Sequence, residues 1–246
     1  MPNGPGLKRM INPPCEVLEW DSEFFGFRIA RLRGTPSSKE EMAHVLDWCV
    51  AEGIRCLYYL APSDNAEVVR IAEEHQFAFV DIRLTLERRG GMPTASSPTV
   101  RLATREDVAS LAAIAKSAHT DSRFYYDQEF PRGRCGELYE LWIEKSCEGF
   151  AGCVLVAEHD GKVAGYTTCN HEGETGRIGL IAVADWIRGA GLGRQLVGSS
   201  LEFFQRRGAK RIQVVTQGRN IPAQRLYQRC GFLTRSLELW YHRWFR

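Results

Sequence analysis

Long apolar runs are missing from the sequence, and their absence argues against a membrane-spanning helix. A helix needs about 20 consecutive apolar residues to cross a bilayer, and no stretch of the 246 residues approaches that length. Residues 1–14 are rich in Pro, Gly and Asn and contain no apolar segment, so we expect no signal peptide. We therefore expect the chain to work in the cytoplasm.

Blocks of like charge are also missing. The formal net charge is only +2, and Arg and Lys are scattered along the chain. A strongly basic region is what attracts a nucleic acid or a membrane surface. We therefore expect neither of these as a partner.

Paired cysteine motifs are absent as well. The eight cysteines form no CxxC pair, and none lies with histidine at the spacing of zinc ligands. We expect no metal site. Dispersed cysteines are typical of small buried thiols in a reducing compartment, which again indicates the cytoplasm.

The sequence does contain one clear break in composition. Residues 89–98 read RGGMPTASSP, which is polar and rich in Gly, Pro and Ser, as linkers are. We interpret this segment as a linker between a small N-terminal α/β domain, residues 1–88, and a larger domain, residues 99–246. A chain of this length suits one large domain or two smaller ones.

The N-terminal part alternates predicted strands and helices. Ser38 and Glu41 form a capping box, and apolar residues at helical spacing follow it, so a helix is expected there. Asp64 is the expected N-cap of a second helix that reaches His75. The expected strands are Cys15–Trp20, Phe27–Arg33, Ile54–Leu60 and Ala78–Leu86.

The C-terminal part has a different order of elements. Thr104 and Asp107 are expected to cap a helix that runs to Lys116, and Asp160-Gly161 favours a hairpin turn. Further helices are expected at Leu138–Ser146, Gly191–Arg207 and Asn220–Arg229, and strands at Thr99–Ala103, Val154–Glu158, Val163–Cys169, Arg177–Val183, Arg211–Thr216 and Leu237–Phe245. This order predicts a mixed α/β fold, in which an antiparallel meander leads into a strand–helix–strand crossover.

A glycine-rich loop carries the main chemical signal. Residues 188–194, RGAGLGR, follow an expected strand and open an expected helix. Glycines remove the β-carbons, so backbone N–H groups can point at an anion. The helix N-terminus and the charges of Arg188 and Arg194 add positive potential. The loop therefore favours phosphate oxygens.

Three other interpretations compete for this loop. The glycines could serve only a tight turn. A Rossmann dinucleotide loop would lie in a first βαβ unit, with an acidic residue about 20 positions on, where this sequence has Lys210 and Arg211. A Walker loop needs Gly-Lys followed by Ser or Thr, which the sequence lacks. A pyrophosphate loop of another kind is favoured.

Two motifs together resemble the GNAT N-acetyltransferase superfamily. Arg188-x-x-Gly191-x-Gly193, placed after a strand, is similar to that family's CoA-pyrophosphate motif. The segment from Asn220 to Phe232, NIPAQRLYQRCGF, resembles its Asn-x-x-Ala-x-x-Leu-Tyr-x-x-x-Gly-Phe signature. The resemblance covers residues 99–245, and it implies a GNAT acyl-CoA N-acyltransferase fold behind a smaller N-terminal α/β domain.

A closer resemblance rests on shorter segments. Trp20–Gly26, WDSEFFG, and Ser122–Phe124 with Trp142–Glu144 are similar to segments of the dTDP-fucosamine acetyltransferases of bacterial surface-polysaccharide synthesis. This resemblance implies acetyl-CoA as the donor and a dTDP-linked 4-amino-4,6-dideoxy sugar as the acceptor. Two alternatives stay open. The chain could acylate another amine, such as an antibiotic, a peptide or a protein, or it could be a non-catalytic acyl-CoA sensor.

The resemblance also implies roles for individual residues. Tyr227 would be the general acid that protonates the departing CoA thiolate, although its spacing fits a core aromatic residue as well. Asn220 would contact the CoA arm, and it could also cap its helix. The other residues implied in acetyl-CoA binding are Ile181, Ala182 and Val183 along the pantetheine, and Arg188, Gly189, Ala190, Gly191, Leu192, Gly193 and Arg194 at the pyrophosphate.

Three questions stay open at the level of the sequence. The loop Asp121–Gly136 could stack on thymine and hold phosphates, or it could merely cover the core. The aromatic strand Leu237–Phe245 could pair across a homodimer or belong to the core. A water relay could accept the amine proton, or one of six side chains could be the general base: Asp21, Asp81, His119, Asp121, His171 or Glu172.

Overall fold

The computed structural model describes residues 13–89 and 99–246, so nearly all of the expected linker at residues 89–98 lies outside the described residues. The chain forms two compact units, Met1–Phe79 with Leu239–Arg246, and Val80–Glu238. This division differs from the expected boundary after residue 88. It falls inside two continuous strands, β4 (Ala78–Arg89) and β10 (Leu233–Trp244), and composition does not reveal such a boundary because neither strand is interrupted there.

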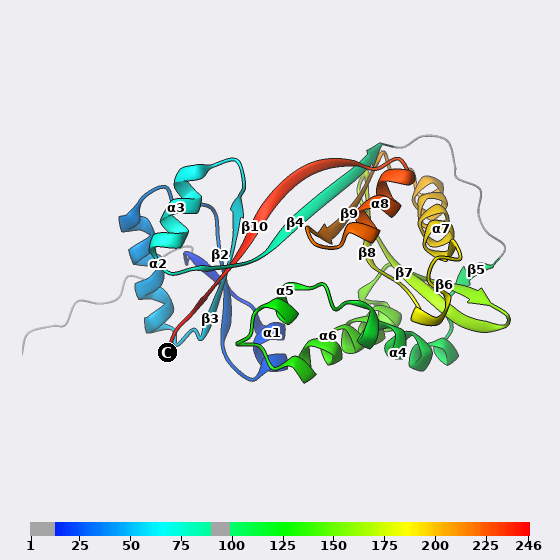
Figure 1. Cartoon of the computed structure of the whole chain (residues 1–246), viewed down its shortest axis with the longest axis horizontal. Coiled ribbons are helices and arrows are strands. Elements are labelled where there is room, and N and C mark those ends of the chain that lie inside the picture. The colour runs from blue at the N-terminus through cyan, green and yellow to red at the C-terminus, as the bar shows by residue number, and fades with distance from the viewer. Residues whose placement is uncertain (1–12, 90–98) are drawn as a thin grey trace, which may run out of the picture. The chain divides into compact units, whose positions relative to one another are not determined.

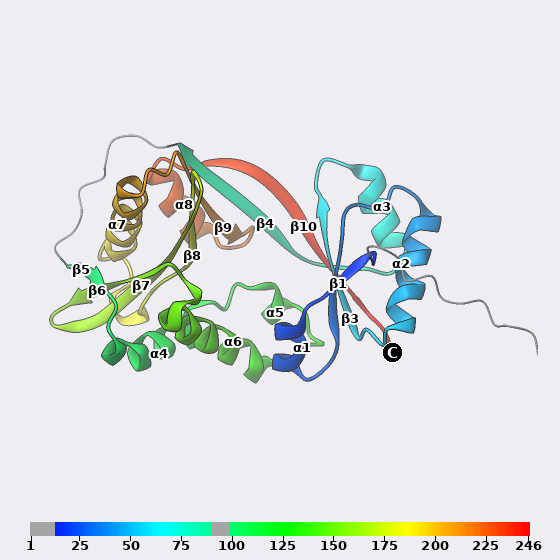
Figure 2. The ribbon, with the colours of Figure 1, turned by 180° about the vertical axis from the view of Figure 1, so that it is seen from behind.

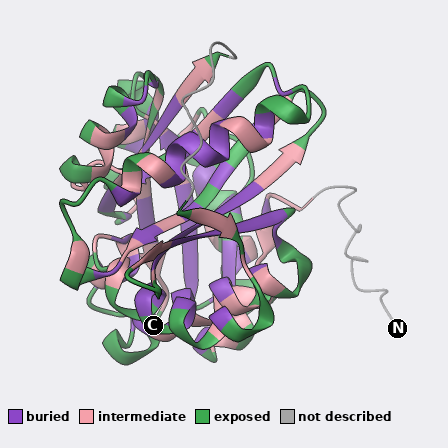
Figure 3. Ribbon diagram, turned by 90° about the vertical axis from the view of Figure 1, so that its right-hand side faces the viewer, coloured by how far each residue is buried: buried purple, intermediate pink, exposed green. Residues whose placement is uncertain are grey.

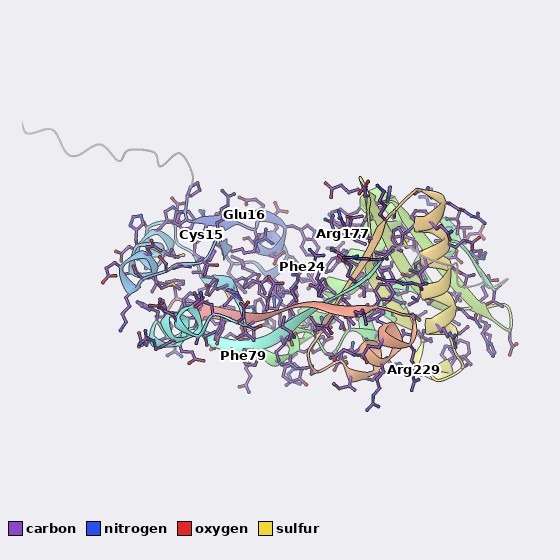
Figure 4. The ribbon with its side chains drawn as sticks, turned by 90° about the horizontal axis from the view of Figure 1, so that it is seen from above. Cys15, Glu16, Phe24, Phe79, Arg177 and Arg229 are labelled. Carbon is purple, nitrogen blue, oxygen red and sulfur yellow. The ribbon has the colours of Figure 1, made fainter. Side chains whose placement is uncertain are left out.

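In the first unit, two helices pack on a small sheet. Strand β2 pairs antiparallel with β1 and parallel with β3. Met42 of α2 and Ile71 of α3 join Leu57 of β3 in one buried apolar cluster. Cys15 and Glu16 are neighbours on β1 (Figure 4). Cys15 is buried, and Glu16 forms an ion pair with Arg31 at 2.8 Å. The elements of this unit are β1 (Cys15–Val17), α1 (Glu19–Phe25), β2 (Ile29–Leu32), α2 (Lys39–Ala51), β3 (Cys56–Pro62) and α3 (Ala66–Glu74).

The second unit contains an antiparallel meander that leads into a parallel crossover (Figures 1 and 2). Its strand order is β10-β4-β9-β8-β7-β6-β5. Strands β5 to β8 are antiparallel, β8 and β9 are parallel, and β4 is antiparallel to β9.

The elements that follow β4 lie entirely in this unit until β10 begins. Three of them are short helical turns: Arg105–Asp107, Ser146–Phe150 and Asp185–Ile187. The others are β5 (Val100–Leu102), α4 (Val108–Ala118), α5 (Arg123–Tyr126), α6 (Arg132–Lys145), β6 (Cys153–His159), β7 (Lys162–Glu172), β8 (Thr175–Val183), α7 (Leu192–Arg206), β9 (Arg211–Gln217) and α8 (Ile221–Arg229).

The main core of the second unit lies between the sheet and the helices α7 and α8. Val197 and Phe204 of α7 and Tyr227 of α8 belong to one buried cluster with Val214 of β9. Figure 3 shows how buried residues recur along the strands while the outer helix faces are exposed. No helix in residues 13–89 and 99–246 is both long and apolar enough to cross a membrane.

Most of the local sequence predictions are confirmed. The Ser38 hydroxyl accepts the Glu41 N–H, and Thr104 and Asp107 form both bonds of a capping box. Asp160 and Gly161 have φ angles of 50° and 72°, as the predicted hairpin turn requires. The last strand is confirmed too, and it is an inner strand of the sheet, since β10 has β3 and β4 as neighbours.

Three predictions were wrong in detail. The expected strand Cys15–Trp20 ends at Val17, and α1 follows because the Ser22 hydroxyl donates to the Leu18 carbonyl and accepts the Ile29 N–H. Asn65, rather than Asp64, caps α3 by accepting the Val68 N–H. The expected loop Asp121–Gly136 contains α5 and the first turn of α6.

Candidate active site

Strand β8 leaves its parallel neighbour β9 halfway along its length. Only Thr175–Ile178 pair with β9, at Arg211–Val214. A β-bulge follows, in which Gly179 and Leu180 together oppose Thr168 of β7. The remaining residues up to Val183 pair with β7 alone. One edge of β8 is therefore open within the sheet.

Glycine is required at the bulge. A β-carbon at Gly179 would lie 2.6 Å from the Thr168 hydroxyl oxygen. That hydroxyl instead accepts the buried N–H of Leu180 at 2.8 Å. The threonine thus replaces a backbone partner and keeps the bulge free of an unsatisfied donor.

The backbone of Ile181 and Val183 faces the open edge. Ala184 donates to Ala164 at 2.8 Å, so this pair lies in the hydrogen-bonded register of β8 and β7. Because backbone groups alternate in direction along an antiparallel strand, Ala182 also faces β7, while Ile181 and Val183 face away from it. An extended ligand could therefore hydrogen-bond to β8 as an added strand.

The glycine loop connects this strand to α7. Gly189 and Gly191 have φ angles of 88° and 85°, which other residues rarely adopt. The backbone N–H groups of Gly189, Gly191, Leu192 and Gly193 make no hydrogen bond to any residue that the structure describes. Unpaired N–H groups at the start of a fifteen-residue helix are an arrangement that can bind an anion.

Arginine side chains add charge beside these donors. Arg188 and Arg194 are exposed, and Arg188 forms a 2.7 Å ion pair with the equally exposed Asp185. An exposed pair of this kind contributes little to stability, so Arg188 can turn toward an anionic ligand.

Helix α8 meets the loop and the open strand at Gly193. A β-carbon there would lie 3.1 Å from Leu226 and 4.0 Å from Val183. Asn220 caps α8, since its side-chain oxygen accepts the Ala223 N–H at 3.1 Å. The residues predicted to bind acetyl-CoA on β8 and in the loop therefore lie next to α8.

Tyr227 is buried in the same region. Its side chain is 2% exposed, and its ring packs against Phe232 with 5.9 Å between centroids. Burial raises the pKa of its phenol above the usual value. The phenol is therefore protonated at neutral pH. Its hydroxyl makes no hydrogen bond to a described residue, so its proton can be donated to a ligand.

A polar cluster surrounds the start of β4. Asp81 is 2% exposed, and Arg219, which follows β9, approaches it at 3.4 Å. Arg219 also donates to the Val80 carbonyl at 2.8 Å, and its guanidinium lies 3.4 Å above the ring of Tyr126. Burial raises the pKa of Asp81 to about 6, and the charges of Arg219 and Arg123 partly oppose this rise.

A second group of aromatic and imidazole side chains lies beside β8. His119 Nε2 is 3.0 Å from the hydroxyl of Tyr166, which is paired in register with Ala182. The imidazole stacks on Tyr139 with 4.5 Å between ring centroids. Burial, helped by the charge of Arg188, lowers the pKa of His119 to about 4. The imidazole is therefore neutral at physiological pH.

The six base candidates are divided between the two units. Asp21 belongs to the first unit, whereas the other five belong to the second. His171 and Glu172 lie at the far end of β7, opposite Gly176 and Thr175. Asp121 acts electrostatically on Asp81 and raises its pKa. Burial raises the pKa of Asp81 and lowers that of His119.

Sequence reasoning missed Thr168 and Arg219. Thr168 gave no signal, because its function depends on a bulge in the neighbouring strand. Arg219 lies two residues after the end of β9, and the region after a strand end is a common position for site residues. The described residues contain no group of three or more His, Cys, Asp or Glu that could hold a metal ion.

Comparison with known proteins identifies the class of this domain. Residues 114–232 match the model of the Acetyltransferase (GNAT) family. The open edge of β8 and the loop of unpaired N–H groups lie within the matched residues. Residues 114–232 therefore belong to a GNAT acetyltransferase domain.

Two curated relatives extend the comparison. The chain is 27% identical to the dTDP-fucosamine acetyltransferase of Escherichia coli over 95% of its own length and 99% of the relative's. It is also 27% identical to the spore coat polysaccharide biosynthesis protein SpsD of Bacillus subtilis over 56% of its length. It spans only 48% of that second relative.

A solved structure supports the fold. A GCN5-related N-acetyltransferase from Sphaerobacter thermophilus superimposes with a TM-score of 0.66 and covers 94% of this chain and 76% of its own. The two sequences are 14% identical, so this likeness concerns the fold alone.

Proposed function

We propose that the protein transfers an acetyl group from acetyl-CoA to the amine of a dTDP-linked 4-amino-4,6-dideoxy sugar, a step of surface-polysaccharide synthesis. The near full-length similarity to a dTDP-fucosamine acetyltransferase supports the acceptor. The open edge of β8, next to the unpaired N–H groups of the glycine loop, is the observation that carries the proposal.

The donor would be held by backbone groups of β8 and of the loop. Ile181 and Val183 would hydrogen-bond the pantetheine arm, with Ala182 between them facing β7. The pyrophosphate would lie on the N–H groups of Gly189 to Gly193, with Arg188 and Arg194 beside it. Asn220 would act mainly as the N-cap, because its side-chain oxygen is engaged by Ala223.

Bound acetyl-CoA supplies the acetyl group as a thioester. An N–H at the open edge would stabilise negative charge on the acyl oxygen, a contribution of about 3–4 kcal/mol in comparable sites. Tyr227 would donate its phenolic proton to the departing sulfur. The C–N bond forms as the C–S bond breaks, and the amine loses one proton.

Asp81 is our proposed acceptor of that proton, directly or through water. Its carboxyl is buried beside Arg219, and with a pKa of about 6 it is mostly ionised above neutral pH. A general base works best when its pKa lies near the working pH. His119, with a pKa of about 4, is a weaker base.

The side chains near Asp81 suit a nucleotide-linked acceptor. Tyr126 is 55% exposed and carries the Arg219 guanidinium on its ring. An exposed aromatic surface can stack on a base, and arginines can pair with a diphosphate. Arg123 is close enough to Asp81 to lower its pKa.

We further propose that the reaction takes place in the cytoplasm. The eight cysteines form no disulfide with one another, and seven of them are buried. Free thiols persist in a reducing compartment, where acetyl-CoA would be available as co-substrate. No metal is part of the proposed reaction.

Thiol release tests the proposed function. The purified protein is mixed with acetyl-CoA and a panel of amines, and free CoA thiol is measured. We expect release with dTDP-4-amino-4,6-dideoxygalactose and none with the same sugar already N-acetylated. Release only with antibiotics, peptides or proteins would contradict the sugar acceptor. Binding of acetyl-CoA with no release for any amine would instead indicate a sensor.

A further inference from the structure

Three pairs of elements are separated by one constant distance in the sequence. Adding 155 to the residue numbers of β3 (Cys56–Pro62) gives β9 (Arg211–Gln217). The same shift turns α3 (Ala66–Glu74) into α8 (Ile221–Arg229), and β4 (Ala78–Arg89) into β10 (Leu233–Trp244). Each pair has equal lengths, so one strand–helix–strand segment occurs twice.

Side chains at equivalent positions perform the same local tasks. Asn65 and Asn220 each cap their helix by accepting the N–H three residues on. Beyond the helices, Gln76 and Gly231 both have positive φ, 61° and 82°. The next residues, Phe77 and Phe232, are both buried. Gln76 adopts this conformation although it is not glycine, which indicates that the turn is a shared feature of the two copies and not a consequence of glycine alone.

The preceding elements repeat as well. Strands β2 and β3 are parallel and joined by α2, just as β8 and β9 are parallel and joined by α7. Ile29 is paired with Cys56, and Thr175 with the equivalent Arg211. Each copy is therefore a β-α-β-α-β unit, with residues 29–89 as the first and 175–244 as the second.

The last strand of each copy lies in the other copy's sheet. Strand β4 ends the first copy but pairs with β9, with Arg83 opposite Gln217. The same register shifted by 155 places His242 of β10 opposite Tyr58 of β3, and these rings stack at 4.6 Å. Phe245 continues this ladder by donating to the Arg55 carbonyl at 3.0 Å.

We infer that the chain contains two copies of one β-α-β-α-β unit, that the two copies exchange their last strands, and that only the second copy binds acyl-CoA. The binding of acyl-CoA by the second copy rests on the proposed function. In copy two, Ile178 is followed by residues 179–191, which hold the bulge, the open edge and the glycine loop. In copy one, Leu32 reaches the helix through residues 33–38 alone.

The first copy has a side chain where the second has an anion site. The Glu41 carboxylate accepts the Ser37 N–H at 2.7 Å and the Ser37 hydroxyl at 3.0 Å, at the start of α2. A carboxylate of the chain thus occupies the helix N-terminus. Ala72 stands at the position equivalent to Tyr227. The first copy has neither the donor site nor the acid.

Exchanging the connector of the second copy for that of the first tests whether residues 179–191 provide the acetyl-CoA site. Residues 179–191 are replaced by the six residues Arg33–Ser38, and folding is followed by circular dichroism and cooperative unfolding. We expect a folded protein that no longer binds acetyl-CoA in a calorimetric titration. A folded graft that still binds would overturn the assignment of the donor site to this connector. The wild type should bind one acetyl-CoA per chain, and two would overturn the loss of the first site.

Hydrogen exchange tests the exchanged strands even if the graft does not fold. In the wild type under mild denaturant, amides of β3 should open together with Leu239–Trp244, and amides of β9 together with Val80–Arg89. If the amides of β3 opened together with those of Val80–Arg89, the proposed exchange of the last strands between the two copies would be overturned. A wild type that binds no acetyl-CoA would refute the proposed donor, while these groupings would still decide the repeat.

Discussion

Leu180 donates its buried backbone N–H to the hydroxyl of Thr168 over 2.8 Å, at the point where β8 separates from β9. The hydroxyl compensates a backbone donor that the bulge has deprived of a carbonyl. The opening of the sheet therefore depends on one threonine side chain and on the missing β-carbon of Gly179.

Replacing this hydroxyl should damage stability and donor binding together. Thr168→Val leaves the Leu180 N–H buried without a partner, which costs about 1–3 kcal/mol of unfolding free energy. Because the bulge sets the open edge, the dissociation constant for acetyl-CoA should also rise. Urea unfolding and calorimetric titration measure the two effects.

Thr167→Val is the matched control. Thr167 is equally buried, but Ser200, its partner at 3.4 Å, keeps a stronger bond to the Leu196 carbonyl at 2.8 Å. We expect a smaller loss of stability and unchanged acetyl-CoA affinity. Equal behaviour of the two variants in both measurements would show that the Leu180–Thr168 bond does not control the opening.

The glycine loop allows a test that separates strain from ligand binding. Gly191 and Gly208 have φ angles of 85° and 75°, and a β-carbon at either would meet no atom within 4 Å. Alanine at each position should destabilise the protein by about 1–2 kcal/mol, the cost of the left-handed conformation. Only Gly191→Ala should raise the KM for acetyl-CoA, since Gly208 lies after the far end of α7. A raised KM in both variants would contradict a local effect.

Local signals in the sequence predicted more of this site than long-range contacts did. The glycine loop and the Asn220 cap are set by neighbouring residues, and both were found. The β8 bulge depends on Thr168 across the sheet, and the pairing of Asp81 with Arg219 joins residues far apart in the chain. No residue pattern within one element carries such information.

The same distinction explains the errors in the fold. Trp20, Phe24 and Phe25 have high strand propensity, yet α1 forms because Ser22 hydrogen-bonds at both ends of the segment. The division into compact units differs from the expected domain boundary for a topological reason. Strand β4 follows α3 in the chain but completes the sheet of the other unit.

The buried carboxylate of Asp107, paired with the partly exposed Arg101, predicts a pH-dependent stability. Asp107 accepts two bonds from Arg101, at 2.7 and 2.9 Å, and the arginine lowers the pKa of this carboxyl from 3.8 to about 2. A lowered native pKa means that the charged form stabilises the fold above pH 4, and that this stability is lost as the pH falls toward 2. Asp107→Asn should therefore lower the unfolding free energy by about 2 kcal/mol at pH 7.

The pH series is the decisive measurement for this pair. The difference in melting temperature between wild type and Asp107→Asn should shrink between pH 4 and pH 2. Glu158→Gln serves as the control, because Glu158 shares Arg101 but is 38% exposed and should contribute less. A difference that stays constant with pH would exclude the carboxylate charge as its source.

The proposed acid makes a clear kinetic prediction. Tyr227→Phe keeps the ring packed against Phe232 but removes the hydroxyl. We expect kcat to fall at least about ten-fold, since a positioned acid contributes this much or more, with the acetyl-CoA dissociation constant nearly unchanged. Tyr241→Phe, which removes the buried hydroxyl bonded to Glu73 in the first unit, should leave kcat unaltered. An unchanged rate in Tyr227→Phe would remove this residue from the mechanism.

The proposed base predicts opposite effects on rate and stability. Burial raises the pKa of Asp81 from 3.8 to about 6, so the cost of ionising Asp81 lowers the stability of the native state in full above pH 6, and this cost fades as the pH falls from 6 toward 3.8. Asp81→Asn should melt higher than wild type at pH 7.5, and the difference should shrink as the pH falls from 6 and vanish below about pH 4. For the wild type, kcat/KM should decline below about pH 6. Asp81→Asn should be at least about ten-fold slower at pH 7.5, and its kcat/KM should not show this decline at acidic pH. Slower turnover with the acidic limb intact would mean that Asp81 positions the site and another group accepts the proton.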